Sequence, residues 1–174
     1  MKRNVSIDDI LKPLSEAPLQ AYLSNLLQVA DVLEWVLGQT GRARIYQTSF
    51  SISEEFLRRL YFIYQKGNIS EINLVLDHTA TNKTLRLWAF ITQVIEKTYL
   101  ADNHSKLLLI EPENADYVVS IITSQNLTRG NRTESTLIST DRNLFNTLRS
   151  EIDELIKFHS IPLNELFRER IAAD

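Results

Sequence analysis

Hydrophobic residues recur at helical spacing early in the chain. Between Leu19 and Leu37 apolar side chains lie three or four positions apart, and Gly38 and Gly41 then provide a stop signal. The members of this pattern are Leu19, Tyr22, Leu23, Leu26, Leu27, Ala30, Leu33, Val36 and Leu37. The spacing predicts one long amphipathic helix, which would give the chain an N-terminal helical extension over about residues 1–41.

The next segments alternate between strand and helix patterns. Arg44–Phe50 is rich in β-branched and aromatic residues and predicts a strand. Ser53, followed by Glu54 and Glu55, predicts the start of a helix that Gly67 ends.

A short apolar run over residues 72–77 predicts a second strand, one that helices cover on both faces. A helix pattern over Leu85–Thr98 follows it. The order strand, helix, strand, helix is typical of an α/β domain.

The second half of the chain predicts a hairpin and a long helix. Residues 105–110 and 117–123 are apolar and are separated by the turn-like sequence EPENAD. Residues 136–140 add a strand, Asp141 caps a helix to about Phe158, and residues 160–162 break the chain before a last helix. Together these patterns predict a single α/β domain over residues 1–174, with a mixed β-sheet sandwiched by helices.

Composition narrows the possible classes of function. The chain has 174 residues and no cysteine, which excludes disulfides, thiolate nucleophiles and cysteine-ligated metals, and which fits a cytoplasmic protein. No signal-peptide pattern and no long uncharged apolar run is visible, so we expect no membrane-spanning helix. The net charge of -3 argues against binding polyanions through overall charge, but it is compatible with a local basic cleft.

Candidate chemistry concentrates around the predicted hairpin. His104 and Lys106 lie two positions apart before its first strand, and residues two apart in a strand point to the same face. The hairpin returns the chain, so that Ser124 and Asn126 come back to the same end of the sheet. An imidazole, an ammonium and an amide can therefore converge on one ligand.

This segment resembles the phospholipase D superfamily, whose motif is HxK, then an acid after four residues, then GSxN and a downstream Glu. His104 and Lys106 match HxK, residues 123–126 stand where GSxN is expected, and Glu134 matches the downstream acid. Two positions depart from the pattern, because Glu111 replaces Asp and Thr123 replaces Gly. The strand and helix order suits the family domain over roughly residues 42–158.

The resemblance implies a mechanism and a partner. His104 would attack phosphorus to give a phosphohistidine, while Lys106 and Asn126, helped by Ser124, would stabilise the charged transition state. Glu134 would orient a histidine, and neither a metal nor a cofactor would be needed. The chain has no second HxK motif, so the resemblance implies a homodimer that completes the site. Small single-motif members resemble dimeric nucleases, which indicates a nucleic acid or another phosphodiester as substrate.

Other interpretations of these residues remain open. Arg129 and Arg132 are candidates for substrate binding, although a solvated role is equally compatible with the sequence. His78 follows a buried strand, where a loop or capping role is the simpler expectation. The alternatives for the whole chain are a catalytically silent module that binds phosphate or nucleic acid, and an interaction domain with an accidental motif.

Overall fold

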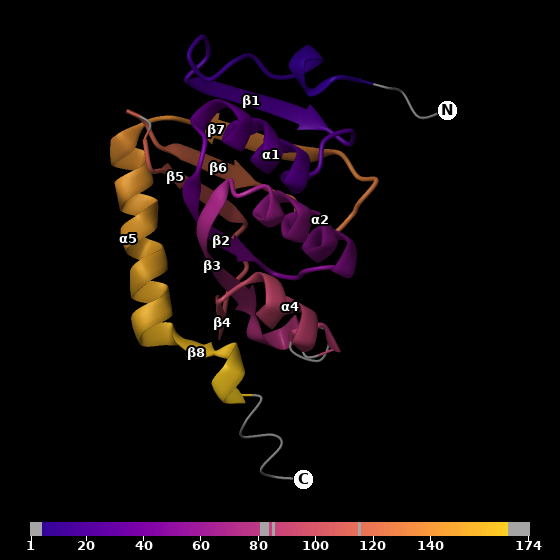
Figure 1. Cartoon of the computed structure of the whole chain (residues 1–174), viewed down its shortest axis with the longest axis vertical. Coiled ribbons are helices and arrows are strands. Elements are labelled where there is room, and N and C mark those ends of the chain that lie inside the picture. Colours follow the sequence, from indigo (N-terminus) through magenta and orange to yellow (C-terminus); the bar gives the residue numbers. More distant parts are fainter. Residues whose placement is uncertain (1–4, 81–83, 85, 115, 167–174) are drawn as a thin grey trace.

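One mixed sheet organises the chain. The computed structural model describes residues 5–80, 84, 86–114 and 116–166. The strands are β1 (Leu19–Ser24), β2 (Ala43–Ser49), β3 (Ile69–Asp77), β4 (Lys97–Ala101), β5 (Leu107–Pro112), β6 (Val119–Thr123), β7 (Glu134–Ser139) and β8 (Ser160–Pro162). Their order in the sheet is β1-β7-β6-β5-β2-β3-β4-β8 (Figure 1). The pairs β2–β3 and β3–β4 are parallel, and the other pairs are antiparallel.

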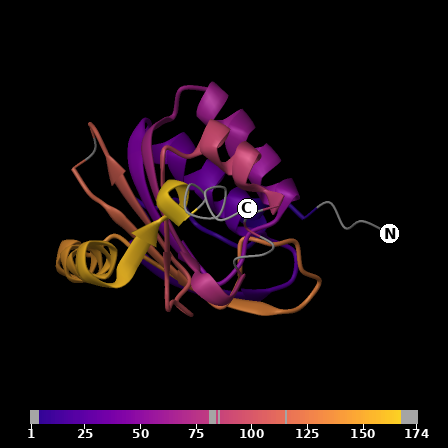
Figure 2. The same ribbon diagram turned by 90° about the horizontal axis from the view of Figure 1, so that it is seen from below.

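Helices cover both faces of this sheet. The helical elements are η1 (Ile7–Asp9), α1 (Val29–Thr40), α2 (Glu54–Gln65), η2 (His78–Ala80), α4 (Trp88–Val94) and α5 (Arg142–His159). Helices α1, α2 and α4 lie on one face, and α5 runs across the other (Figure 2). The predicted α/β class, with a mixed sheet sandwiched by helices, is confirmed.

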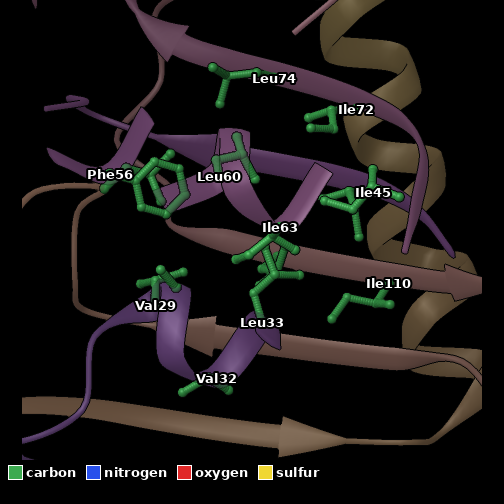
Figure 3. Packing of buried hydrophobic residues seen from close by; sticks show 14 of the residues in the cluster. Val29, Val32, Leu33, Ile45, Phe56, Leu60, Ile63, Ile72, Leu74 and Ile110 are labelled. Carbon is green, nitrogen blue, oxygen red and sulfur yellow. The ribbon is translucent and has the colours of Figure 1, made fainter. Parts of the chain in front are cut away.

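Two apolar clusters hold the layers together. In the larger one, side chains of α1 and α2 pack on residues of β2, β3 and β5 (Figure 3). The labelled members are Val29, Val32, Leu33, Ile45, Phe56, Leu60, Ile63, Ile72, Leu74 and Ile110. A smaller cluster under α5 joins Phe145 and Ile152 to Tyr46, Leu109 and Val118. Burial of these apolar side chains is the main force that fixes the helices on the sheet.

The predicted single helix over Leu19–Leu37 is wrong in its first part. Residues 19–24 form strand β1, which pairs with β7, and the helix begins only at Val29. Leu19, Ala21 and Leu23 alternate with polar or half-buried positions, so this stretch fits the period of a strand as well as that of a helix. The N-terminal segment is therefore an edge of the sheet and not a helical extension.

Two short strands lie where the sequence predicts the end of a helix and a break before the last helix. The helix predicted over Leu85–Thr98 ends at Val94, and Lys97–Ala101 pairs with β3 as β4. Residue 85, the predicted helix start, lies outside the described residues. Ser160–Pro162 pairs with β4 as β8, and residues 163–166 are helical as predicted. Short strands of this kind take their structure from their neighbours and not from a long local pattern.

The other predicted elements are confirmed. Strands β2, β3 and β7 and the β5–β6 hairpin lie where the sequence places them. Ser53 accepts a hydrogen bond from Phe56 N at 3.3 Å at the start of α2, and Asp141 accepts one from Leu144 N at 2.6 Å at the start of α5. In the described part of the chain, no helix has the length and apolar character needed to cross a membrane.

One edge of the sheet gathers the loops that carry the predicted chemistry. Strands β2 and β3 end at Ser49 and Asp77, and β5 begins at Leu107 opposite Thr48. Strand β6 ends at Thr123, where it pairs with β7 close to that strand's first residue. The loops after β2, β3, β4 and β6 therefore meet at this edge.

Candidate functional site

His104 lies in the exposed loop between β4 and β5. Its ring packs against the ring of Phe50 at a centroid distance of 5.3 Å. Its backbone carbonyl accepts a hydrogen bond from Lys106 Nζ at 3.0 Å. Lys106 O in turn accepts from Thr123 N at 3.1 Å, which ties the start of β5 to the end of β6. Lys106 therefore contacts the backbone of residue 104, and the convergence of its ammonium and the His104 imidazole on one ligand stays a prediction.

Asn126 reaches the same place from the other side of the hairpin. Its Oδ1 lies 3.4 Å from Ser49 Oγ, a hydroxyl whose nearer acceptor is Ser51 O at 2.8 Å. The next residue, Leu127, donates its N–H to Ser49 Oγ at 3.1 Å and forms an isolated bridge with Ile52. The end of β2 thus supports both loops, since Phe50 contacts His104 and Ser49 contacts Asn126.

Ser124 and Glu134 form a pair beside this group. The Ser124 hydroxyl donates to the Glu134 carboxylate, and it accepts from Ser135 N at 3.0 Å. Among the described contacts, the hydrogen bond of Glu134 goes to Ser124, so its predicted bond to an imidazole stays a prediction.

The two arginines that were candidates for substrate binding differ in their surroundings. Arg129 forms an ion pair with Glu55 at 3.0 Å on the N-terminal turn of α2. Arg132 is exposed in the loop before β7. A phosphate would have to compete with Glu55 for Arg129, whereas Arg132 is open to solvent.

Glu111 lies far from His104. It pairs with Arg44 across β2 and β5, with Oε2 3.4 Å from the Arg44 guanidinium and 3.5 Å from Tyr46 Oη. Position 44 is four residues along β2 from Thr48, the partner of the first residue of β5, which corresponds to about 13 Å. Glu111 therefore supports the far end of the hairpin, and it does not line the candidate site.

We expect Glu111→Gln to change phosphodiester cleavage by no more than about twofold, because this carboxylate lies at the opposite edge of the sheet. Its exposed ion pair should contribute only about 0–1 kcal/mol to the free energy of unfolding. Steady-state kinetics and urea unfolding measure the two effects. A tenfold loss of kcat with an unchanged fold would contradict this placement.

The sequence did not predict the cluster formed by Asp77, His78 and Asp102. Their ligating atoms lie within 4.8 Å of one another, a spacing that a metal ion can bridge. His78 Nδ1 lies 3.2 Å from Ala101 O, which fits its expected loop role. Both oxygens of Asp77 already accept hydrogen bonds, from Thr79 N at 2.8 Å and from Asn103 N at 3.0 Å. These bonds indicate that Asp77 holds backbone in place.

The hydrogen bonds around Asp77 set its charge state. Burial raises the pKa of this carboxyl, but the donors Thr79 and Asn103 and the nearby His78 together outweigh burial, so the pKa lies below its usual value. Asp77 is therefore ionised at neutral pH. The sequence signal that could have drawn attention to it is an aspartate ending a buried strand at the carboxyl edge of parallel strands.

We expect Asp77→Asn to lower the free energy of unfolding at neutral pH by about 1–3 kcal/mol, because an amide NH₂ would face the N–H of Asn103. Because the pKa of Asp77 is lower in the folded than in the unfolded chain, its ionised form stabilises the fold. This stabilisation is complete above the unfolded pKa of about 3.9, and it is lost as the pH falls through the lower native pKa. Urea unfolding along a pH series should show the variant and wild type converging in acid. A difference that does not depend on pH would contradict this account.

Comparisons with known proteins identify the fold. The sequence matches no protein-family model and no curated protein. The structure is similar to Nuc from Salmonella typhimurium, a phospholipase D family member, with a TM-score of 0.61 and 15% identity over 83% of this chain and 96% of that one. NucT from Helicobacter pylori gives a TM-score of 0.59 at 14% identity over 81% of this chain and 98% of that one.

A third similar structure belongs to a larger protein. TrmBL2, an archaeal chromatin protein, gives a TM-score of 0.53 at 9% identity, and the match covers 82% of this chain and 53% of that one. Nuc and NucT match along nearly their whole length, and the strand order places the HxK segment at the start of a hairpin as the sequence predicts. The chain therefore has the fold of the phospholipase D superfamily.

Proposed function

We propose that this protein is a metal-independent phosphodiesterase, specifically a nuclease, that acts through a phosphohistidine at a site completed by a second copy of the chain. One observation carries the proposal. The end of β2 and the β5–β6 hairpin bring His104, Lys106 and Asn126 to one edge of a phospholipase D-type sheet.

The proposed reaction has two displacements at phosphorus. A ring nitrogen of His104 attacks phosphorus, the bond to the leaving oxygen breaks, and that oxygen takes a proton. Water then attacks the phosphohistidine, gives a proton to the group that served as acid in the first step, and releases the His104 imidazole. Lys106 Nζ and the Asn126 amide donate to the non-bridging oxygens, where fixed donors stabilise charge in the transition state. Ser124 and Arg132 are proposed to contact the substrate, and Arg129 joins them only if its pair with Glu55 opens.

The leaving oxygen needs an acid, and a second copy of His104 supplies one in this proposal. A two-fold axis beside the site would bring two imidazoles together, one neutral as nucleophile and one protonated as acid. Glu134, which already accepts from Ser124, is proposed to orient one of the two rings through its remaining acceptor capacity.

An open part of the sheet gives the second copy a place to bind. Strand β1 exposes Leu19 and Leu23, and β7 exposes Leu137, with 66%, 76% and 36% of their surfaces accessible, on the face that α5 covers elsewhere. A groove over these strands contains Leu23, Leu137 and Ser124, and none of its lining residues is charged. An apolar, uncharged surface is complementary to itself, as a two-fold interface requires. Because Ser124 lies in the groove and bonds Glu134, this surface adjoins the candidate site.

The proposal of a nuclease depends on the single HxK segment and on the match to nearly the full length of Nuc and NucT. The chain carries one HxK segment, and it aligns with nearly the full length of Nuc and NucT. The test is incubation of the purified wild-type chain with single- and double-stranded DNA, RNA and a small phosphodiester in excess EDTA. Cleavage that persists in EDTA is expected. Absence of cleavage of all these substrates would contradict the proposal.

A second candidate function is a silent module that binds nucleic acid through the same edge. The similarity to TrmBL2, whose structure shows a mode of DNA binding, favours it. Binding that weakens steeply with salt and is unchanged in His104→Ala, without cleavage, would support this alternative.

A further inference from the structure

A buried asparagine lies beside the exposed His104. Asn103 has only 4% of its surface accessible, whereas Asp102 and His104 on either side of it are exposed. A polar side chain at this depth is costly unless its hydrogen bonds are made. Asn103 is therefore the point at which the loop between β4 and β5 is attached to the body of the protein.

The bonds of Asn103 reach the ends of β2 and β3 and the residue that follows His104. Its backbone N–H donates to Asp77 Oδ2 at 3.0 Å, and its Nδ2 donates to Ser49 O at 3.2 Å. Its Oδ1 accepts from Ser105 N at 3.1 Å and from Ser105 Oγ at 2.5 Å. The residues immediately before and after His104 are thus bound to each other and to the ends of β2 and β3.

The network continues into the start of β5. The Ser105 hydroxyl lies 2.8 Å from Thr48 Oγ1, and Thr48 Oγ1 accepts from Leu107 N at 3.0 Å. Because Ser105 Oγ gives its proton to Asn103, Thr48 donates to Ser105 and accepts from Leu107. Thr48, Ser105 and Leu107 each donate within this chain of hydrogen bonds, which makes the arrangement specific.

Ser49 connects this network to Asn126. Its carbonyl accepts from Asn103, and its hydroxyl contacts Asn126 Oδ1 at 3.4 Å. Ser49, at the end of β2, therefore contacts two loops. One carries His104, the candidate nucleophile, and the other carries Asn126, a candidate hydrogen-bond donor to the phosphate oxygens. A change at Asn103 alters the first loop relative to the second.

We infer that Asn103, held by Asp77, is a positioning residue that sets His104 relative to Asn126 through Ser49. This inference rests on the proposed function, because it concerns the same site. Asn103 itself touches neither substrate nor the reacting atoms. Its contribution is the placement of the imidazole, and misplacement of a catalytic group by about 1 Å can cost roughly 100-fold in rate.

The test compares Asn103→Ala with a matched control, Asn73→Ala. Asn73 is also a buried asparagine and lies in β3, where its side chain donates to Glu71 instead of to the site. We expect Asn103→Ala to lower kcat about 10- to 100-fold with KM within about threefold, because placement of His104 and not substrate contact is lost. Asn73→Ala should keep wild-type kcat even if its midpoint of unfolding falls as far.

Hydrogen exchange separates this inference from the proposed function. Exchange of the Ser105 amide, which donates to Asn103 Oδ1, should become at least about tenfold faster in Asn103→Ala and stay unchanged in Asn73→Ala, whether or not the protein cleaves anything. If the wild-type chain has no activity but the two variants show this exchange pattern, only the proposed function is overturned. Unchanged exchange in Asn103→Ala, or a kcat loss that Asn73→Ala shares, would overturn the positioning role.

Discussion

His104→Ala should reduce the proposed phosphodiester cleavage by about 10³-fold or more, while the oligomeric state and the thermal unfolding stay as in wild type. The imidazole is the proposed nucleophile in one copy and the proposed acid in the other, so one substitution removes both functions from the site. Since His104 is an exposed loop residue whose described ring contact is with Phe50, we expect little stability to depend on it. Rates with and without EDTA, measured beside circular dichroism and light scattering, give the result.

His159→Ala is the matched control for this substitution. His159 is also exposed and ends α5, where it lines a pocket with Thr48 and Ser105, so it is a nearby histidine outside the proposed catalytic set. The His159→Ala variant should cleave the substrate at the wild-type rate. If His104→Ala retains most of the activity, or if His159→Ala loses as much, His104 is not the nucleophile.

Leu23→Lys combined with Leu137→Lys should convert the proposed dimer to a monomer and abolish the proposed cleavage. Each leucine side chain covered by a partner is worth about 1.5–3 kcal/mol, and the two-fold axis counts each substitution twice. The added ammonium groups would also face one another across the axis, which opposes association further. Light scattering and activity over a dilution series measure both effects.

The matched control for the surface is Phe62→Lys. Phe62 is 64% exposed on α2, on the opposite face of the sheet, so its substitution adds the same charge at a similarly apolar and accessible position. This variant should remain dimeric and active. If the double leucine variant still forms dimers, the interface lies elsewhere. If the wild-type chain cleaves at its full rate as a monomer, the site is not shared between two copies.

Local pattern predicted those elements whose signals are strong and unambiguous. Strands β2 and β3, the β5–β6 hairpin and the caps Ser53 and Asp141 follow from periodicity and capping chemistry, which act over a few residues. The sequence predicts a helix where strand β1 forms, because residues 19–24 satisfy the periods of both elements. The exposed leucines of this strand belong to a face whose covering the sequence does not reveal.

The candidate site could be predicted only in part. The sequence predicts that His104, Lys106 and Asn126 come to one end of the sheet, because a hairpin returns the chain by a short connection, and their catalytic roles stay a prediction. Asp77, Asn103 and Ser49 were missed because their bonds depend on the register of β2, β3 and the loop after β4, which sequence spacing does not reveal. The cytoplasmic location stays a prediction.

The stereochemical course of cleavage tests the central claim most directly. Each in-line displacement inverts phosphorus, so attack by His104 followed by attack of water gives net retention, whereas direct attack of water gives inversion. A nucleic acid with one phosphorothioate of known configuration, cleaved in isotopically labelled water, distinguishes the two. Retention is predicted for the wild-type chain, and inversion would show that no phosphohistidine lies on the path.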